Sequence, residues 1–259
     1  MKKLTLLVLA MFLLVATACG DDSGDDGSGD AATDTTTDSG GESQELLVLA
    51  ASSLTNAFTA MEPVFEDAHP GVDVVLTFDS SSTLAGQVAE GGPAGVLATA
   101  DENNMATAVD SGNVSGEPVI FTSNSGVIAV PAGSDTVTAP EDLQGDIVLA
   151  VCAPEVPCRV VADEMFAELG IDPEIDSEEE NVAAVVTKLE ADEVDAGVVY
   201  VTDDIASDDI EAIDIGAVVV TTEYPIVAVS DHAAAQAFVD FVSGPEGQSL
   251  LTETGFVAP

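Results

Sequence analysis

The sequence predicts an α/β fold with two lobes, a ligand cleft between the lobes and two extended crossover segments. Three observations carry this prediction. From residue 45 onward, short apolar runs alternate with segments of helical hydrophobic spacing, the β-α-β-α-β order that is typical of parallel sheets. A second set of such elements begins near residue 126. A long apolar stretch over 216–230 then leads back towards the C-terminal helices.

The first lobe is predicted from apolar runs that are separated by Gly and Pro stop signals. The predicted elements are a strand over 45–51, a helix over 55–69, a strand over 72–78, a helix that begins after the three serines at 80–82 and ends at 91–93, and a strand over 95–100. Because right-handed crossovers join parallel strands, the strand-to-helix turns should share one edge of the sheet, where such sheets bind ligands.

The second lobe repeats this alternation. Its predicted elements are strands over 126–131, 146–151 and 196–201 and helices over 160–169 and 182–191. The stretch 216–230 is too long for one ordinary strand and is interpreted as the crossing back to the first lobe. The last helices of that lobe are predicted over 233–242 and 246–253. The acidic run 176–181 (DSEEEN) is predicted as a solvated loop that ends at Asn181 as a helix N-cap.

The N-terminus has the pattern of an export signal. Lys2 and Lys3 precede an apolar run and the small-residue segment ATACG. The predicted organisation is a signal peptide over 1–18, a lipidated Cys19 followed by a disordered acidic linker up to residue 43, lobe 1 over 44–124 and 222–259, and lobe 2 over 125–221. The alternative is an ordinary cleavage site next to Ala18, which would give a soluble secreted protein instead of one anchored to the cell membrane.

The charge of the chain excludes some classes of partner. The chain has 48 acidic and four basic residues. Removal of residues 1–18 takes away two cations and no acid, which leaves Arg159 and Lys188 and a net charge of −46. A basic-groove nucleic-acid binder is therefore excluded, and adsorption to anionic lipid is disfavoured.

The residue types that serve most enzymes are scarce in this chain. Only His69 and His232 could act as imidazole bases, and both occur in sequences typical of a helix end or a helix start. Cys152 and Cys158 lack the C-x-x-C spacing of thiol oxidoreductases. With Cys19 assigned to lipid, these two cysteines are expected to form a disulfide outside the cell membrane. No catalysis, cofactor or protein-bound metal is expected.

Four predicted helix starts indicate an anion site. Ser52-Ser53 and Ser80-Ser81-Ser82 follow the first two strands, and the segments 155–159 (EVPCR) and 180–182 (ENV) begin helices of the second lobe. Helix N-termini present unpaired N–H groups and the positive end of the helix dipole. If they face one cleft, they would hold an oxyanion without a counter-charge.

These segments resemble the molybdate-binding proteins of ABC transporters, which have the type II periplasmic-binding-protein fold. The resembling segments are AASSLTNAF (50–58), FDSSSTLAGQ (78–87), GGPAGVLATAD (91–101), APEVPC (153–158), NVAAVV (181–186), AGVVY (196–200) and EYPIVAV (223–229). The resemblance implies a monomeric receptor outside the cytoplasmic membrane that captures molybdate, and tungstate too, and delivers it to an ABC permease.

The resemblance also implies a set of ligand-binding groups. They are the hydroxyls of Ser53, Ser81 and Tyr200 and the backbone amides of Cys158 and Val182. No basic side chain belongs to this set.

Two departures from the family pattern and three alternative functions remain open at this point. The family usually has Asp where this chain has Gly95, and Arg159 follows an amide donor where many relatives have a small residue. We expect Arg159 to pair with the abundant carboxylates. The alternatives are a receptor for another tetrahedral oxyanion such as sulfate, a serine hydrolase that uses Ser53 or Ser81, and a structural surface protein.

Overall fold

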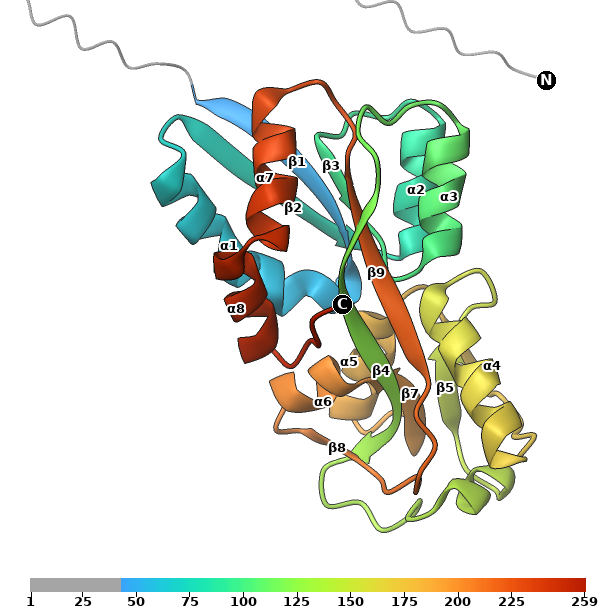
Figure 1. Cartoon of the computed structure of the whole chain (residues 1–259). Helices are drawn as coiled ribbons and strands as arrows, with labels where there is room; N and C mark the ends of the chain where they lie inside the picture. Colours follow the sequence, from blue (N-terminus) through green and yellow to red (C-terminus); the bar gives the residue numbers. More distant parts are fainter. Residues whose placement is uncertain (1–42) are drawn as a thin grey trace, which may run out of the picture. The chain divides into compact units, whose positions relative to one another are not determined.

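A nine-stranded mixed sheet is the scaffold of the computed structural model, which describes residues 43–259 of the chain (Figure 1). The predicted signal peptide, Cys19 and nearly all of the predicted acidic linker lie outside the described residues. The strands are β1 (Gln44–Ala51), β2 (Val72–Asp79), β3 (Val96–Ala98), β4 (Val119–Pro131), β5 (Leu149–Cys152), β6 (Ser177–Glu179), β7 (Ala196–Tyr200), β8 (Ile210–Ala212) and β9 (Thr221–Ala228).

Eight α-helices and two short 3₁₀ helices connect these strands in the described residues. The α-helices are α1 (Thr55–Ala68), α2 (Ser81–Ala89), α3 (Glu102–Asp110), α4 (Pro157–Leu169), α5 (Val182–Glu190), α6 (Val201–Ala206), α7 (Ala233–Ser243) and α8 (Pro245–Glu253), and the 3₁₀ helices are η1 (Ser52–Leu54) and η2 (Pro140–Gln144). None of the described helices is both long and apolar enough to cross a membrane.

The sheet contains two parallel groups of strands joined by two long antiparallel strands. β1 pairs in parallel with β2 and β3, and β5 pairs in parallel with β6 and β7. Between these groups, β9 runs antiparallel to both β3 and β4, and β4 runs antiparallel to β7. Figure 1 shows β4 and β9 side by side, passing from one half of the fold into the other. They are the two crossover segments that the sequence predicts.

Separate hydrophobic cores stabilise the two halves. In lobe 1, the half that contains β1 to β3, Phe58, Phe65 and Phe238 pack edge-to-face between the sheet and helices α1 and α7. A smaller core under α2 and α3 covers the other face of that sheet. In lobe 2, the half that contains β5 to β8, one core joins β4, β5 and β7 to α4 and α5. Burial of each large apolar side chain contributes about 1.5–3 kcal/mol to folding.

The strands and helices predicted from apolar periodicity are confirmed, with corrections at several ends. The strand predicted over 146–151 begins three residues later, because the amides of Val148 and Leu149 bond to the side chains of Asp195 and Asp176. The helix predicted from residue 160 begins at Pro157, a residue that suits the first helical position. The helix α3, the short helix α6 and the strand β8 were not predicted.

The prediction of a solvated loop over 176–181 was wrong in part. Ser177–Glu179 forms β6, a three-residue strand at the edge of the sheet, and pairs with β5 through backbone hydrogen bonds. Asn181 is the N-cap of α5, as predicted, and its Oδ1 accepts a hydrogen bond of 3.0 Å from the amide of Ala184.

Gly95 fits a close contact between neighbouring strands. A Cβ atom at this position would lie 2.5 Å from Leu46 Cδ1 and 3.1 Å from the carbonyl oxygen of Leu47. The Gly95 amide donates a 2.7 Å hydrogen bond to that carbonyl, and the Gly95 carbonyl accepts one of 2.8 Å from Val229. Gly95 therefore packs directly against β1, in a space that leaves no room for a side chain.

Candidate functional site

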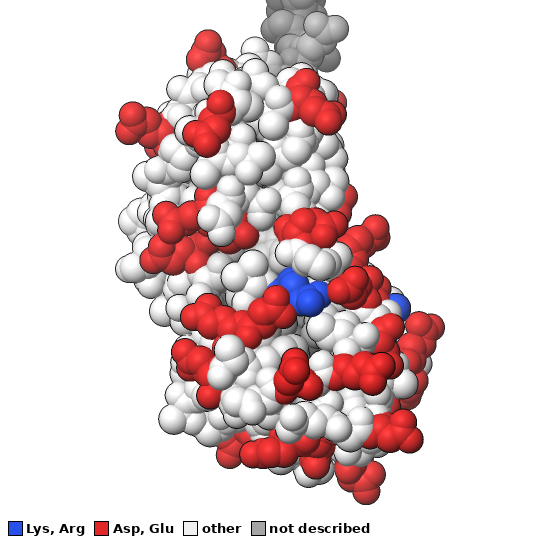
Figure 2. All heavy atoms as spheres, turned by 90° about the vertical axis from the view of Figure 1, so that its right-hand side faces the viewer, with Lys and Arg blue, Asp and Glu red and all other residues white. Residues whose placement is uncertain are grey.

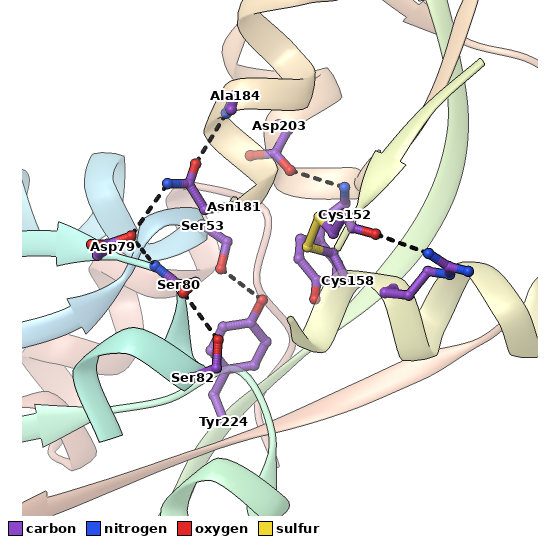
Figure 3. Close-up of a disulfide and its surroundings, with 12 residues drawn as sticks. Ser53, Asp79, Ser80, Ser82, Cys152, Cys158, Asn181, Ala184, Asp203 and Tyr224 are labelled. Atoms are coloured by element: carbon purple, nitrogen blue, oxygen red, sulfur yellow. Dashed lines mark hydrogen bonds between the residues drawn. A yellow bond between two sulfur atoms is a disulfide. The ribbon is translucent and has the colours of Figure 1, made fainter. Parts of the chain in front are cut away.

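The turn after β1 places the first candidate hydroxyl. β1 ends at Ala51, and η1 and α1 follow without a gap, so Ser53 lies in the first turn of a continuous helical segment. Its side chain is buried. Ser53 Oγ lies 2.9 Å from Tyr224 Oη, a contact between residues 171 positions apart in the sequence (Figure 3).

The turn after β2 has the same arrangement. Ser80 is the N-cap of α2, and its Oγ accepts a hydrogen bond from the amide of Thr83. Ser81 is buried, and its Oγ accepts a 2.9 Å hydrogen bond from the amide of Ala100, just beyond β3. The Ser82 hydroxyl bonds back to Ser80 Oγ at 3.1 Å. The three serines therefore have three different roles.

Lobe 2 supplies two helix N-termini. Cys158 is the second residue of α4, which follows β5, and Val182 is the first residue of α5, which follows β6. Amides in the first turn of a helix have no partner within that helix, so both N–H groups are free to donate. The sulfur atoms of Cys152 and Cys158 lie within disulfide-bonding distance, and their Cα atoms are 5.8 Å apart. The last residue of β5 is thus held next to the first turn of α4.

Tyr200, the last residue of β7, is the fifth member of the candidate set. Its side chain is 1% exposed, and its Oη has no hydrogen-bond partner among the described residues. Burial raises the pKa of this phenol well above its ordinary value, and the nearby Tyr224 adds to the effect. Tyr200 therefore keeps its phenol proton. An unpaired buried polar group is costly, and such groups in a folded protein mark places where a ligand can supply the partner.

Asp203 lies one turn after Tyr200, and its carboxylate accepts a 2.9 Å hydrogen bond from the Tyr200 amide. Burial raises the pKa of Asp203 to about 7, against the lowering effect of this bond. The hydrogen bond from the Tyr200 amide to Asp203 helps to fix the backbone at the end of β7.

All five candidate residues line one small cavity between the lobes. Its volume is about 10 Å³, far below the roughly 300 Å³ at which pockets for drug-sized ligands begin. The lining residues are Ala51, Ser52, Ser53, Asp79, Ser80, Ser81 and Ala100 from lobe 1 and Val156, Pro157, Cys158, Val182 and Tyr200 from lobe 2. The candidate groups meet there because each lies at or just after the carboxyl end of a strand in one of the two parallel groups. The cavity is small, and candidate donors converge on it from both sides.

The lining contains one charged residue, and it is negative. Asp79, the last residue of β2, accepts hydrogen bonds from the Ser80 amide at 2.6 Å and from Asn181 Nδ2 at 3.5 Å (Figure 3). The second bond joins the lobes across the cleft. Two donors hold the Asp79 carboxylate in place. It adds negative charge beside the cavity, and no positively charged side chain lines the cavity to offset it.

The two cations of the described chain are paired with carboxylates. Arg159 Nε donates to Asp163 at 2.8 Å and its Nη1 donates to Glu178 at 2.9 Å, and hydrogen bonding to Asp163 raises the pKa of the guanidinium. Lys188 pairs with Glu179 at 2.6 Å. The expectation that Arg159 pairs with acids is confirmed. On the face of the molecule that Figure 2 shows, acidic side chains far outnumber basic ones.

The histidines have structural roles. His69 follows α1 and stacks on Phe65 with ring centroids 4.0 Å apart. His232 is the N-cap of α7, where its Nδ1 accepts from the amide of Ala234. Neither imidazole lines the cavity, so neither could serve Ser53 or Ser81 as the base of a hydrolase.

Comparison with known proteins assigns the family. A family model described as bacterial extracellular solute-binding protein matches residues 46–257. The chain belongs to this family. The type II periplasmic-binding-protein fold predicted for it is confirmed, and so is its resemblance to molybdate-binding proteins. This solute-binding protein is 32% identical to the molybdate-binding protein ModA of Mycobacterium tuberculosis (strain H37Rv), with 98% of this chain and 97% of the relative covered. It is 33% identical to ModA of Escherichia coli, over 82% of this chain and 88% of the relative.

Solved structures share the fold at lower identity. The periplasmic molybdate-binding protein of Azotobacter vinelandii aligns with a TM-score of 0.69 and 18% identity over 83% of this solute-binding protein and 99% of that chain. The sulfate-binding protein SubI of Mycobacterium tuberculosis aligns with a TM-score of 0.68 and 19% identity over 82% and 86%. The fold is thus common to receptors named for different oxyanions.

Three residues next to the candidate set were missed as functional residues by reasoning from the sequence. Tyr224 contacts Ser53 from a strand far along the chain, and Asp79 and Asn181 bridge the lobes. Asp79 stands directly before the serine cluster, so its position was a usable signal. The partner of Ser53 had no local signal.

Proposed function

We propose that this solute-binding protein is a molybdate receptor that also takes tungstate and catalyses no reaction. The observation that carries the proposal is the Tyr200 hydroxyl, which has no hydrogen-bond partner in residues 43–259, in a small cavity that Ser53, Ser81, Cys158 and Val182 also line. These five groups are the proposed ligand set. Each can donate one hydrogen bond, and a tetrahedral oxyanion has four oxygens that accept them.

Neutral donors suit a dianion in this setting. Buried N–H and O–H groups that are already oriented replace the water around the ion and need no counter-charge. A basic side chain would have to leave its carboxylate partners to reach the cavity. The pairing of Arg159 with Asp163 and Glu178 therefore supports a neutral site.

We further propose that the chain works outside the cytoplasmic membrane as the receptor of an ABC permease. The sequence signal at residues 1–18 and the name of the family support this location. Lipid anchoring through Cys19 and a monomeric state remain predictions from the sequence. The lobe boundaries at 124/125 and 221/222 are also proposed, since the two cores change over within β4 and at the start of β9. A covalent Cys152–Cys158 disulfide is proposed from the distance between the sulfurs.

A calorimetric panel tests the proposed function. The purified chain is titrated with molybdate, tungstate, sulfate and phosphate at one pH and one salt concentration. We expect molybdate and tungstate to bind, with the other two much weaker. Preferred binding of sulfate would assign the chain to the alternative oxyanion. No binding of any of the four would remove the proposal and favour a structural surface protein.

A further inference from the structure

Ser53 and Ser81, the two serines of the proposed ligand set, differ in the hydrogen-bond partner of their hydroxyl oxygen. Ser81 Oγ accepts a hydrogen bond of 2.9 Å from the amide of Ala100. Ser53 Oγ is hydrogen-bonded to the phenol oxygen of Tyr224, also at 2.9 Å (Figure 3). Tyr224 is fully buried and is not among the residues that line the cavity.

The direction of the bond at Ser81 follows from chemistry alone. An amide N–H only donates, so Ser81 Oγ is the acceptor in its bond to Ala100. A serine hydroxyl has a single proton. The proton of Ser81 is therefore not used in this bond and remains available to the cavity.

The bond at Ser53 has two possible directions, because either hydroxyl could donate. If Ser53 donated to Tyr224, its only proton would point away from the cavity and its lone pairs would face the bound oxyanion. If Tyr224 donates, the Ser53 proton is free to point at the ion. Molybdate and tungstate carry no proton near neutral pH, so each group that contacts them must be a donor.

We infer that Tyr224 is a positioning residue that donates to Ser53 and thereby directs the Ser53 proton into the cavity. The inference rests on the proposed function. Tyr224 would do for Ser53 what the Ala100 amide does for Ser81. The Tyr224 ring is held for this role by edge-to-face contacts with Phe256, Tyr200 and Phe121, at centroid distances of 5.4, 6.3 and 6.4 Å.

A double-mutant cycle in molybdate binding tests this role. Calorimetry is carried out on wild type, Ser53→Ala, Tyr224→Phe and the double variant at fixed pH and salt. We expect Tyr224→Phe alone to weaken binding about three- to tenfold, as loss of one orienting hydrogen bond should. In the Ser53→Ala background, where no proton is left to direct, the same change should alter the dissociation constant by less than about twofold.

The matched control uses Ser81. In a Ser81→Ala background, Tyr224→Phe should still weaken binding by its full three- to tenfold, because Tyr224 does not act through Ser81. An equal effect of Tyr224→Phe in all three backgrounds would overturn the inference, since a general loosening of the fold acts in that way. No effect in wild type would overturn it too, and so would unchanged binding by Ser53→Ala. If the wild type binds none of the oxyanions in the panel, the proposed function has failed first.

A second measurement avoids variants altogether. Neutron diffraction from deuterium-exchanged wild-type crystals grown with molybdate locates the two hydroxyl deuterons. We expect the Tyr224 deuteron on the line to Ser53 Oγ and the Ser53 deuteron on the side of the ion. A Ser53 deuteron on the line to Tyr224 Oη would refute the inference.

Discussion

Ser81 and Ser82 are neighbours in α2, yet only Ser81 lines the cavity. The Ser81 hydroxyl is buried and bonded to Ala100, whereas Ser82 bonds to Ser80 within the turn. The start of α2 thus places Ser80 and Ser81 at the cavity and leaves Ser82 out of its lining. A pair of single substitutions can separate these roles.

Ser81→Ala should weaken molybdate binding by about 1–3 kcal/mol, the usual effect of removing one partner of a buried hydrogen bond to a charged group. It should also lower the melting temperature, because the Ala100 amide loses its acceptor. Ser82→Ala should leave the affinity within about 0.5 kcal/mol of wild type, as surface substitutions do. Calorimetry on both variants checks this, and an unchanged affinity of Ser81→Ala would show that Ser81 is not a ligand-binding group.

Tyr200→Phe should separate binding from stability. The Tyr200 hydroxyl has no partner among the described residues, so its removal should break no hydrogen bond within that part of the chain. The melting temperature without ligand should stay the same or rise, while molybdate affinity falls by about 1 kcal/mol. Thermal melts with and without molybdate measure both effects. A large drop in the ligand-free melting temperature would mean that the hydroxyl is satisfied within the protein.

At the scale of elements, apolar periodicity predicted most strands and helices because each buries a continuous face. It missed β6, because Ser177–Glu179 contains no apolar residue and is held by backbone pairing at a sheet edge. It also missed α3, although Asp101 supplies an N-cap signal through its 2.7 Å bond to Asn104. The five site residues were named through the family resemblance. The Ser53–Tyr224 contact depends on two strands meeting across 171 residues, which no local pattern records.

The proposed disulfide should matter more for binding than for folding. Cys152 and Cys158 are six residues apart, so the bond closes a short loop and contributes less than the roughly 3 kcal/mol of a 15-residue loop. It would hold the start of α4, where the Cys158 amide faces the cavity. We expect reduction to raise the dissociation constant for molybdate severalfold and to lower the melting temperature only slightly.

Mass spectrometry of the non-reduced protein checks the bond itself. It should show Cys152 joined to Cys158, and a free thiol pair in protein from the cell envelope would remove the proposed disulfide. The same spectrum shows whether Cys19 carries lipid.

At the scale of the whole molecule, a strongly anionic protein is proposed to bind an anion. The chain has 48 acidic residues against four basic ones, and the two described cations pair with carboxylates and do not line the cavity. Long-range electrostatics therefore oppose the approach of molybdate. Contacts inside the cavity must supply the affinity, and they come from both lobes, which the Asp79–Asn181 bond joins across the cleft.

Added salt should separate the long-range repulsion of molybdate from the contacts inside the cavity. The Debye length is about 10 Å at 0.1 M and about 3 Å at 1 M, so added sodium chloride screens distant carboxylates and leaves groups in direct contact with the ion almost unaffected. Molybdate association should become faster, and affinity should hold or improve, between 0.1 M and 1 M sodium chloride. If stopped-flow and calorimetric measurements show that the association rate and the affinity both fall steeply with salt, a basic side chain contacts the ion. Arg159 would then be the first residue to substitute.

Anomalous diffraction at the molybdenum absorption edge, from crystals grown with molybdate, tests the neutral oxyanion site most directly. The site predicts one strong peak in the cavity between the lobes. The oxygens around that peak should lie about 2.5–3.2 Å from the hydroxyls of Ser53, Ser81 and Tyr200 and from the amides of Cys158 and Val182. A peak outside this cavity, or one with the Arg159 guanidinium or the Lys188 ammonium in direct contact with the ion, would contradict the account.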